Sequence, residues 1–311
     1  MSQQVNSERI RLRVAFRNMF YTTIYVAVEG GFLAEQGLDV DFDHIPAGQS
    51  STDLLKAGEI DITQSGISRS FMDLDAGSDA PPLHVAEINQ RDGFFLLSRR
   101  PTDGWTWADL IGATLIPVGF TPVPYTTLQA AMRWHGVDPA SVNLMAGLSA
   151  EEMLGRFRNG DADYLQVPYP FAGQLVDEGS GHIAVTLGTE SGYVCYSSFA
   201  VTPAYLAENP ETVQRFVNGY ARAQRWVAES EPEAVAERIA SMFPEYDRAL
   251  LADGVRRYKG AGVWATDPMI GRNGFDRMRD ALIAGGLVEG AHPYESIVRP
   301  EFAEQASAEL V

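Results

Sequence analysis

The stretch that decides the fold is RLRVAFRNMFYTTIYVAVEGGFLAEQGLDVDFDHIPAGQSSTDLLKAGEIDITQSGISRSF, residues 11–71. Apolar and polar side chains alternate in Leu12–Phe16, Leu38–Phe42 and Ile60–Thr63, and each alternation predicts a strand. The segments between them keep a helical spacing of apolar residues. Strands and helices that alternate over short links indicate a parallel sheet with right-handed crossovers, and therefore an α/β fold.

Three loops follow these predicted strands, at residues 17–21, 48–51 and 64–68. Ligands of parallel sheets bind beyond the carboxyl ends of the strands, often at helix N-termini. The three loops are rich in Ser, Gln, Asn and aromatic residues, and none carries an obvious catalytic group. This composition favours binding over catalysis.

Composition limits the classes of protein. The chain has 311 residues, 45% of them hydrophobic, which predicts two globular units with a substantial core. The net charge of −17 argues against a nucleic-acid partner, because phosphate binding requires clustered Lys and Arg. The single Cys195 excludes an intrachain disulfide and a multi-cysteine metal site.

The compartment stays open at this stage. No stretch approaches about 18 consecutive apolar residues, so no membrane insertion is expected. Residues 1–10 contain no apolar segment of the kind that a secretory signal requires. As written, the sequence predicts a cytoplasmic protein, or a periplasmic one if a signal was removed.

One segment recurs about 100 residues later. Lys56–Gln64 aligns without a gap on Arg158–Gln166, with the basic residue, the glycine, an acid, an aspartate and the final glutamine all repeated. Chance similarity of two helix–strand corners is the alternative. The favoured interpretation is two similar Rossmann-like lobes, each with a glutamine at the end of an equivalent strand, which face each other across a cleft.

The repeat and the strand pattern together give domain boundaries. We expect a discontinuous first lobe of residues 8–98 and 199–311, and a second lobe of residues 99–198. Two chain crossings, near 98–101 and 193–198, would form the hinge. The C-terminal region is predicted to be helical, with helices that begin at or near prolines, which first turns tolerate: 203–208, 210–229, 232–241, 246–259 and 268–285.

Five segments resemble a known family: YVAVEGGFLAEQGLDV at 25–40, LKAGEID at 55–61, WADLIGATL at 107–115, NGDAD at 159–163 and PYESIV at 293–298. On these residues the chain resembles the type II periplasmic solute-binding proteins of the thiamine-pyrimidine-precursor, alkanesulfonate and taurine uptake group. The resemblance runs from about Leu12 to Ala306. It implies two α/β lobes that close on a small molecule and deliver it to an ABC permease. We also expect the protein to be a monomer.

The resemblance also implies positions for the ligand site. These are Asn18–Tyr21, Gln49–Ser51, Ser65–Ser68, Thr121–Thr126 and Tyr169. The sequence departs from the family pattern in one respect: exported members carry a signal peptide, and residues 1–10 show no signal of this kind.

The predicted ligand-binding residues are polar or aromatic and lie in or beside the loops: Arg17, Asn18, Phe20, Tyr21, Gln49, Ser50, Ser51, Gln64, Ser65, Ser68, Arg91, Thr121, Tyr125, Thr126, Gln166, Tyr169 and Tyr193. The aromatic members could stack on a flat ring, or pack between loop and core. Arg17 or Arg91 could bind a carboxylate or sulfonate, or pair with a surface acid. Gln64 and Gln166 could bind the ligand from opposite lobes, or cap a helix.

No catalytic or metal site is predicted. The five histidines show no HxH or HExxH spacing, and neither a GxSxG nor a GxxxxGK[ST] motif occurs. For Cys195 a buried neutral thiol is favoured over a nucleophile. We therefore expect no cofactor and no metal.

The leading hypothesis is a binding protein for a small organic solute, either aromatic, heterocyclic and pyrimidine-like, or a sulfonate or carboxylate, that serves ABC-type import. The rival is a cytoplasmic enzyme on the same scaffold, for pyrimidine-precursor synthesis, desulfination or decarboxylation. A desulfinase-like enzyme would require a cysteine where the chain has Asn18 and Met19, and a pyrimidine-synthase-like enzyme would require a cysteine-rich motif. A cytoplasmic ligand sensor is a third hypothesis.

Overall fold

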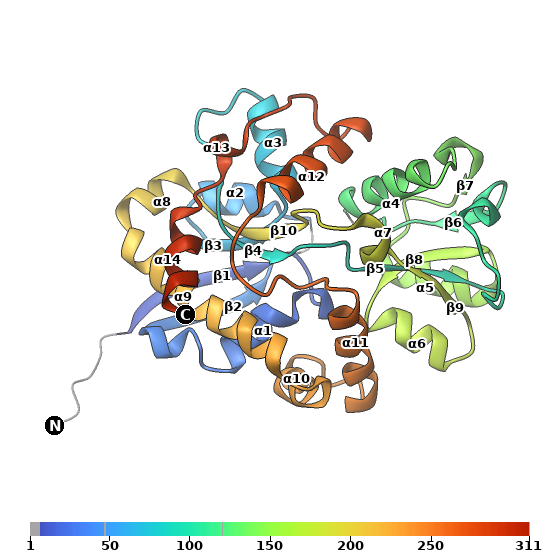
Figure 1. Ribbon diagram of the computed structural model, residues 1–311, viewed down its shortest axis with the longest axis horizontal. Helices are drawn as coiled ribbons and strands as arrows, with labels where there is room; N and C mark the ends of the chain where they lie inside the picture. Colours follow the sequence, from blue (N-terminus) through green and yellow to red (C-terminus); the bar gives the residue numbers. More distant parts are fainter. Residues whose placement is uncertain (1–6, 47, 120, 311) are drawn as a thin grey trace.

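The computed structural model describes residues 7–46, 48–119 and 121–310, and within them the strands form two five-stranded sheets placed side by side (Figure 1). The predicted α/β fold with two lobes is confirmed. Residues 1–6, part of the stretch that bears on a secretory signal, lie outside the described residues. Among the described residues, no helix is both long and apolar enough to span a bilayer.

The sheet of the first lobe has the strand order β2-β1-β3-β10-β4. β1 is parallel to β2 and β3, while β10 is antiparallel to both of its neighbours. Every second side chain of β1 is buried, as the alternating sequence predicts. The strands are β1 Glu8–Val14, β2 Leu38–His44, β3 Ile62–Ser65, β4 Leu83–Asn89 and β10 Ser197–Val201.

The sheet of the second lobe has the order β7-β6-β8-β5-β9. β6 is parallel to β7 and β8, while β5 is antiparallel to β8 and β9. In each sheet, therefore, the antiparallel strand is the one that directly follows a crossing from the other lobe. The strands are β5 Phe94–Ser98, β6 Thr114–Ile116, β7 Asn143–Leu144, β8 Tyr164–Pro168 and β9 His182–Thr186.

The first crossing differs from the expected one. The sequence analysis assigns Phe94–Ser98 to the first lobe, but β5 pairs with β8 and β9 of the second sheet, so the chain crosses at residues 90–93 instead of 98–101. All residues of β5 are buried, and an apolar run does not show which of two sheets it enters. The second crossing, residues 192–196, falls close to its expected place.

Helices cover both sheets (Figure 1). The second lobe carries α4 Val123–Trp134, α5 Ala150–Asn159, α6 Phe171–Asp177 and α7 Leu187–Ser191. Before β5 the chain forms α1 Thr22–Glu29, α2 Ser51–Lys56 and α3 Ile67–Asp75. After β10 it forms α8 Pro203–Glu208, α9 Pro210–Glu229, α10 Pro232–Ile239, α11 Arg248–Gly260, α12 Arg272–Ala284, α13 Tyr294–Ile297 and α14 Glu301–Glu309. Single 3₁₀ turns occur at Met19–Tyr21, Ala34–Gln36, Trp107–Leu110, Pro139–Ser141 and Ala240–Met242.

The internal sequence repeat is accompanied by a repeat of hydrogen bonds in the structure. The Asp61 carboxylate accepts the backbone N–H of Arg11 at 2.7 Å, at the edge between β3 and β1. The Asp163 carboxylate accepts the backbone N–H of Thr114 at 2.9 Å, at the corresponding edge between β8 and β6. Each aspartate therefore fixes the register of its strand against the neighbouring parallel strand.

The two glutamines of the repeat also have one role in common. Gln64 Oε1 accepts the N–H of Ala15, and Gln166 Oε1 accepts the N–H of Val118, both at 3.2 Å. Each glutamine thus holds the loop that leaves the carboxyl end of the adjacent strand. Gln166 additionally donates from Nε2 to the carbonyl of Pro124 at 2.7 Å, in the first turn of α4. The two loops held in this way face the same cleft.

Gln166→Leu should lower the free energy of unfolding by about 2 kcal/mol, because it leaves the buried N–H of Val118 without its acceptor and removes one of the donors to the Pro124 carbonyl. Urea unfolding monitored by circular dichroism measures this. Gln305→Leu, at an exposed position on α14, is the matched control and should change the stability by less than about 0.5 kcal/mol. Equal effects of the two substitutions would contradict the role given to Gln166.

Candidate functional site

A cleft lies between the two lobes, where the loops after β1, β3 and β6 meet. It consists of an inner cavity of about 90 Å³ and an outer cavity of about 610 Å³. The two are continuous, because both are lined by Ala15, Phe16, Ser51, Arg69 and Thr121. Thr121 belongs to the second lobe and the others to the first, so the cleft is built from both lobes.

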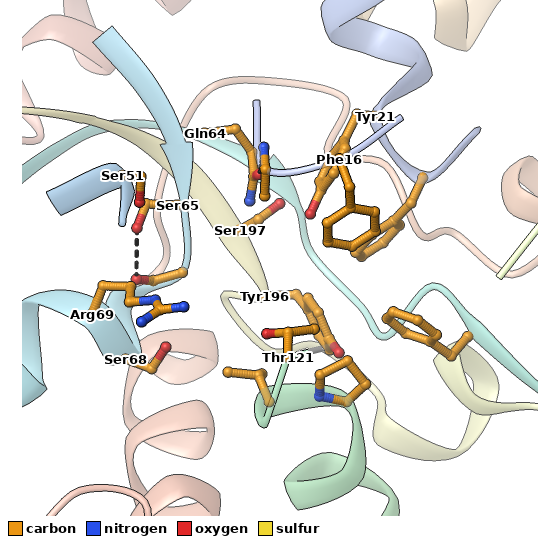
Figure 2. Close-up of a pocket in the computed structure, with 16 residues that line it drawn as sticks. Phe16, Tyr21, Ser51, Gln64, Ser65, Ser68, Arg69, Thr121, Tyr196 and Ser197 are labelled. Atoms are coloured by element: carbon orange, nitrogen blue, oxygen red, sulfur yellow. Dashed lines mark hydrogen bonds between the residues drawn. The ribbon is translucent and has the colours of Figure 1, made fainter. Parts of the chain in front are cut away.

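One wall of the inner cavity is polar. Ser65 ends β3, and Ser68 and Arg69 lie in the first turn of α3 (Figure 2). The helix starts after Gly66, which supplies no side-chain cap, and its first turn contains no acidic residue. Within the described residues, the Arg69 guanidinium forms no ion pair and no hydrogen bond. This wall is therefore electropositive and open to an acceptor.

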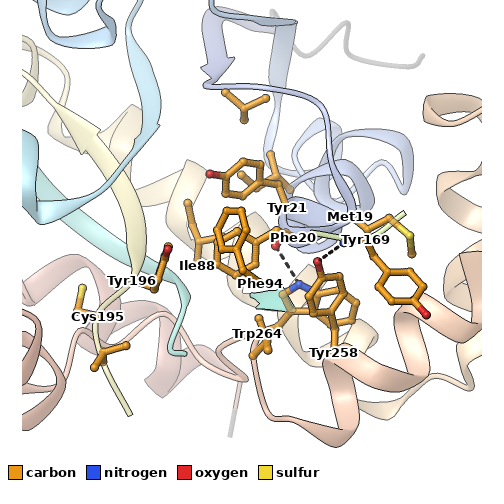
Figure 3. Packing of buried hydrophobic residues seen from close by; sticks show 14 of the residues in the cluster. Met19, Phe20, Tyr21, Ile88, Phe94, Tyr169, Cys195, Tyr196, Tyr258 and Trp264 are labelled. Atoms are coloured by element: carbon orange, nitrogen blue, oxygen red, sulfur yellow. Dashed lines mark hydrogen bonds between the residues drawn. The ribbon is translucent and has the colours of Figure 1, made fainter. Parts of the chain in front are cut away.

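The opposite wall is aromatic. Phe20, Tyr21, Phe94 and Tyr196 line the inner cavity, and Phe16 joins them at the boundary with the outer cavity (Figures 2 and 3). The Phe20 ring centroid lies 5.3 Å from that of Tyr21, 5.9 Å from Phe94 and 5.2 Å from Tyr196. These rings pack edge-to-face or tilted against one another and form one apolar group at the cavity.

The position of Phe20 is fixed from several sides. Its carbonyl accepts hydrogen bonds from Asn89 Nδ2 at 2.8 Å and from Trp264 Nε1 at 2.9 Å. Its backbone N–H donates to Asn18 Oδ1 at 2.7 Å. A Cβ atom on Gly93 would lie 2.1 Å from the Phe20 ring, so the first crossing accepts only glycine at that position.

Three buried polar atoms at the cleft have no hydrogen-bond partner within the described residues: Tyr196 Oη, Asn18 Nδ2 and His44 Nε2. Tyr196 lines the inner cavity, and Asn18 and His44 line the outer one. A buried polar group without a partner is uncommon, because losing its hydration costs free energy. The cleft lining therefore includes three residues with a buried polar atom that no described residue pairs.

Acidic side chains are excluded from the cleft. The chain contains 41 Asp and Glu residues, yet among the described residues none of them lines either cavity. Arg17 and Arg69 both line the outer cavity. The cleft is therefore an electropositive region of a strongly acidic protein.

The predicted binding residues divide into two groups, of which the first lines the cleft. Arg17 does so while its guanidinium pairs with the Glu245 carboxylate and donates to the Met242 carbonyl at 2.8 Å. The residues of this group are Arg17, Asn18, Phe20, Tyr21, Gln49, Ser51, Gln64, Ser65, Ser68 and Thr121.

The second group lies outside the residues that line the two cavities. Ser50 caps α2 by accepting the Asp53 N–H. Thr126 donates to the Pro122 carbonyl, and Tyr125 is half-buried on the same helix. Gln166 supports Pro124 from behind, as described above.

Three further members of that group are held in the protein interior or at the crossings. The hydroxyl of Tyr169 donates to Asp253 Oδ2 at 2.7 Å, and that of Tyr193 donates to the Glu87 carboxylate at 3.2 Å. Arg91 donates to the Gly188 carbonyl at 3.4 Å. The hydroxyls of both tyrosines bind carboxylates of the protein itself. These two side chains therefore pack within the protein, which is the alternative to stacking on a ligand.

Sequence reasoning missed several residues that line the cleft, among them Phe16, His44, Arg69, Phe94 and Tyr196. Arg69 directly follows the predicted binding loop 64–68, and a loop predicted one residue longer would have included it. Phe94 and Tyr196 adjoin the two crossings, and their exposure to the cleft follows from where the chain crosses.

Neither the Cys195 thiol nor the Asp92 carboxyl lines the cleft. Cys195 is fully buried, and burial raises the pKa of its thiol. Asp92 is buried in the first crossing, where it accepts hydrogen bonds from Thr127 Oγ1 at 2.6 Å and Phe94 N at 2.8 Å. Within the described residues, no three His, Cys, Asp or Glu side chains are grouped to hold a metal ion. The geometry suits binding.

Comparison with known proteins gives the family. Residues 18–234 match the family described as NMT1/THI5 like, so the chain belongs to that family. It is 26% identical over 308 residues to a putative binding protein, YtlA, of Bacillus subtilis, covering 99% of this chain and 92% of that protein. It is 27% identical over 230 residues to the formylaminopyrimidine-binding protein of Halalkalibacterium halodurans, covering 71% and 66%. The suspected family group is confirmed.

Solved structures share the fold. A putative periplasmic sulfonate-binding protein, SsuA, of an ABC transporter from Methylobacillus flagellatus has a TM-score of 0.74 at 16% identity, covering 98% of this chain and 95% of its own. The desulfurization enzyme DSZB has a TM-score of 0.69 at 16% identity, covering 98% and 100%. The fold therefore occurs in binding proteins and in at least one enzyme.

Tyr196→Phe should leave the free energy of unfolding unchanged or raise it by up to about 1 kcal/mol, because the hydroxyl it removes is buried without a partner. Tyr220→Phe is the matched control. It removes a bond of 2.8 Å to Thr23 and should lower the stability by about 1 kcal/mol. Urea unfolding of the ligand-free protein compares the two. A loss at Tyr196 as large as that at Tyr220 would show that the hydroxyl is used within the protein.

Asp92 should make stability depend on pH. Burial raises its pKa to about 7, well above the value of about 3.9 in an unfolded chain. The stability contribution is therefore complete below about pH 4 and is lost as the pH rises through about 7. Relative to Asp92→Asn, the free energy of unfolding of the wild type should fall by up to about 1.4 kcal/mol per pH unit over that window. Denaturant unfolding at pH 4–8 measures it, and a difference that is flat with pH would contradict the assignment.

Proposed function

We propose that this protein is a solute-binding protein that captures a small organic molecule between its two lobes and delivers it to an ABC-type permease. The observation that carries the proposal is the cleft itself. It is lined from both lobes, contains buried polar atoms without a partner, and has no cysteine and no carboxylate among its described lining residues. Such a site binds a molecule by enclosing it, with a few polar contacts for orientation.

Closure of the lobes would occur at the two crossings, residues 90–93 and 192–196. Only these two segments connect the two sheets along the described chain. Side chains also meet across the lobes: the Arg277 guanidinium of α12 lies 4.4 Å from the Trp134 ring centroid of α4. Hinge closure around a ligand is the usual motion of two lobes joined in this way.

The comparisons support the same proposal. One relative is named for binding formylaminopyrimidine and one structural neighbour for binding sulfonates. These names agree with a ligand that is aromatic or heterocyclic, or that carries a sulfonate or carboxylate. The monomeric state and the permease partner belong to this proposal too.

An enzyme on the same scaffold is the second candidate, and the fold shared with a desulfurization enzyme is the observation in its favour. The lining of the cleft argues against it. Within the described residues the cavities contain no cysteine and no carboxylate, and the single thiol is fully buried. His44 is the one histidine among the described lining residues, and burial lowers the pKa of its imidazole.

Native mass spectrometry of the purified protein tests the proposal directly. A co-purified small molecule should be released unchanged on denaturation, and adding it back should raise the melting temperature in proportion to the logarithm of its concentration. Small-angle scattering should show a smaller radius of gyration with ligand. Release of a compound that differs from the one added would mean turnover and would favour the enzyme.

A cleft-filling variant provides the control. Ser51→Trp places a large side chain where both cavities meet and should abolish binding of the released compound. Ala207→Trp, at an exposed position on α8 outside the cleft lining, should bind it as the wild type does. Equal binding by both variants would mean that the ligand site lies elsewhere.

A further inference from the structure

We infer that the solute is a flat aromatic ring carrying an anionic oxygen group, a carboxylate or a sulfonate, and that Arg69 binds this group. The inference deepens the proposed function and rests on it. Its basis is the division of the inner cavity into an electropositive wall and an aromatic wall, which face each other across the space for one small molecule (Figure 2).

The electropositive wall starts at the N-terminus of α3. The first amides of a helix lack acceptors within the helix, and they attract negative charge. At α2 the protein supplies its own acceptor, because the Ser50 side chain caps the helix and Asp53 lies in its first turn. At α3 the cap position is Gly66 and no acidic residue follows in the first turn. An oxygen anion from outside the chain would complete α3 in the way that Ser50 completes α2.

Arg69 is the cation available at this wall. Of the two arginines that line the cleft, Arg17 is already paired with the Glu245 carboxylate. The Arg69 guanidinium has no partner within the described residues, and it lines both cavities. A guanidinium binds a carboxylate or sulfonate through two parallel hydrogen bonds, which suits a planar or tetrahedral oxygen group.

The Tyr196 hydroxyl is a second, independent sign of a ligand. Tyr196 is only 6% exposed, its hydroxyl has no partner within the described residues, and it lines the inner cavity together with Arg69. Its ring packs edge-on against Phe20 in the aromatic wall. Tyr196 thus contributes its ring to the aromatic wall and brings a buried, polar hydroxyl close to the cavity.

The aromatic wall and the charge of the cleft limit the solute further. Phe16, Tyr21 and Phe94 line the inner cavity, and an aromatic solute would pack against these rings more favourably than an aliphatic anion. The inner cavity of about 90 Å³ holds little more than one ring, and larger substituents extend into the outer cavity. A cationic solute would find no carboxylate in either cavity.

Isothermal titration with benzoate, benzenesulfonate and benzamide tests the inference on the full-length protein freed of ligand by denaturation and refolding. Benzamide matches benzoate in shape but carries no charge. Benzoate or benzenesulfonate should bind at least tenfold more tightly than benzamide. Arg69→Gln should remove this advantage, lowering the affinity for the anion at least tenfold while leaving that for benzamide within twofold. Arg69 is exposed and unpaired, so this variant should melt at the same temperature as the wild type.

Two further variants keep the result interpretable. Arg100→Gln removes an exposed positive charge outside the cleft and should change the affinity for the anion less than twofold. Arg17→Gln tests the rival anchor, and a loss as large as that from Arg69→Gln would overturn the assignment. Equal binding of benzoate and benzamide to the wild type, or binding of neither anion at millimolar concentration, would overturn the inference.

The failure of this inference is distinguishable from failure of the proposed function. If the compound released in native mass spectrometry is uncharged or cationic, or lacks an aromatic ring, the protein remains a solute-binding protein and the inference is wrong. If a ring-bearing acid is released but is chemically altered by the protein, the inference on the ligand stands and the proposed function falls.

Discussion

The arrangement of the cleft depends on how Phe20 is held at the junction of the two lobes. Its carbonyl accepts two side-chain hydrogen bonds, from Asn89 and Trp264, and its ring lies against the backbone of Gly93 in the first crossing. This contact places the 3₁₀ turn Met19–Tyr21 directly beside the segment about which the lobes would rotate. The aromatic wall is therefore continuous with the hinge, and a ligand that packs on the wall also contacts the part that determines lobe closure.

The charge of the cleft is the opposite of the charge of the protein. A chain with a net charge of −17 repels anions at long range, so an anionic ligand needs a local site where this repulsion is overcome. The absence of carboxylates among the described lining residues, together with Arg69 and the uncapped start of α3, provides such a site. The acidic surface then affects solubility, while the first turn of one helix determines what binds.

The sequence predicted the fold well because the fold follows from periodic patterns and a repeated corner. Asp61 and Asp163, and Gln64 and Gln166, have the equivalent roles that their alignment implies. The site was predicted less completely, because long-range packing decides which side chains line the cleft. Tyr169 and Tyr193 face internal carboxylates, and Tyr196, three residues beyond Tyr193, faces the cavity. β5 was assigned to the wrong sheet for the same reason, because long-range packing also decides which sheet a buried strand joins.

The two equivalent glutamines differ in one respect that bears on how such a protein changes its ligand over evolutionary time. Gln64 both holds its loop and lines the inner cavity, whereas Gln166 holds its loop from behind the cavity. A substitution at Gln64 would thus alter specificity and loop geometry together, and selection against misfolding would oppose it. Ser68 and Arg69 line the cavity, and within the described residues their side chains hold no loop, so substitutions at these two positions are the simplest route to a new specificity.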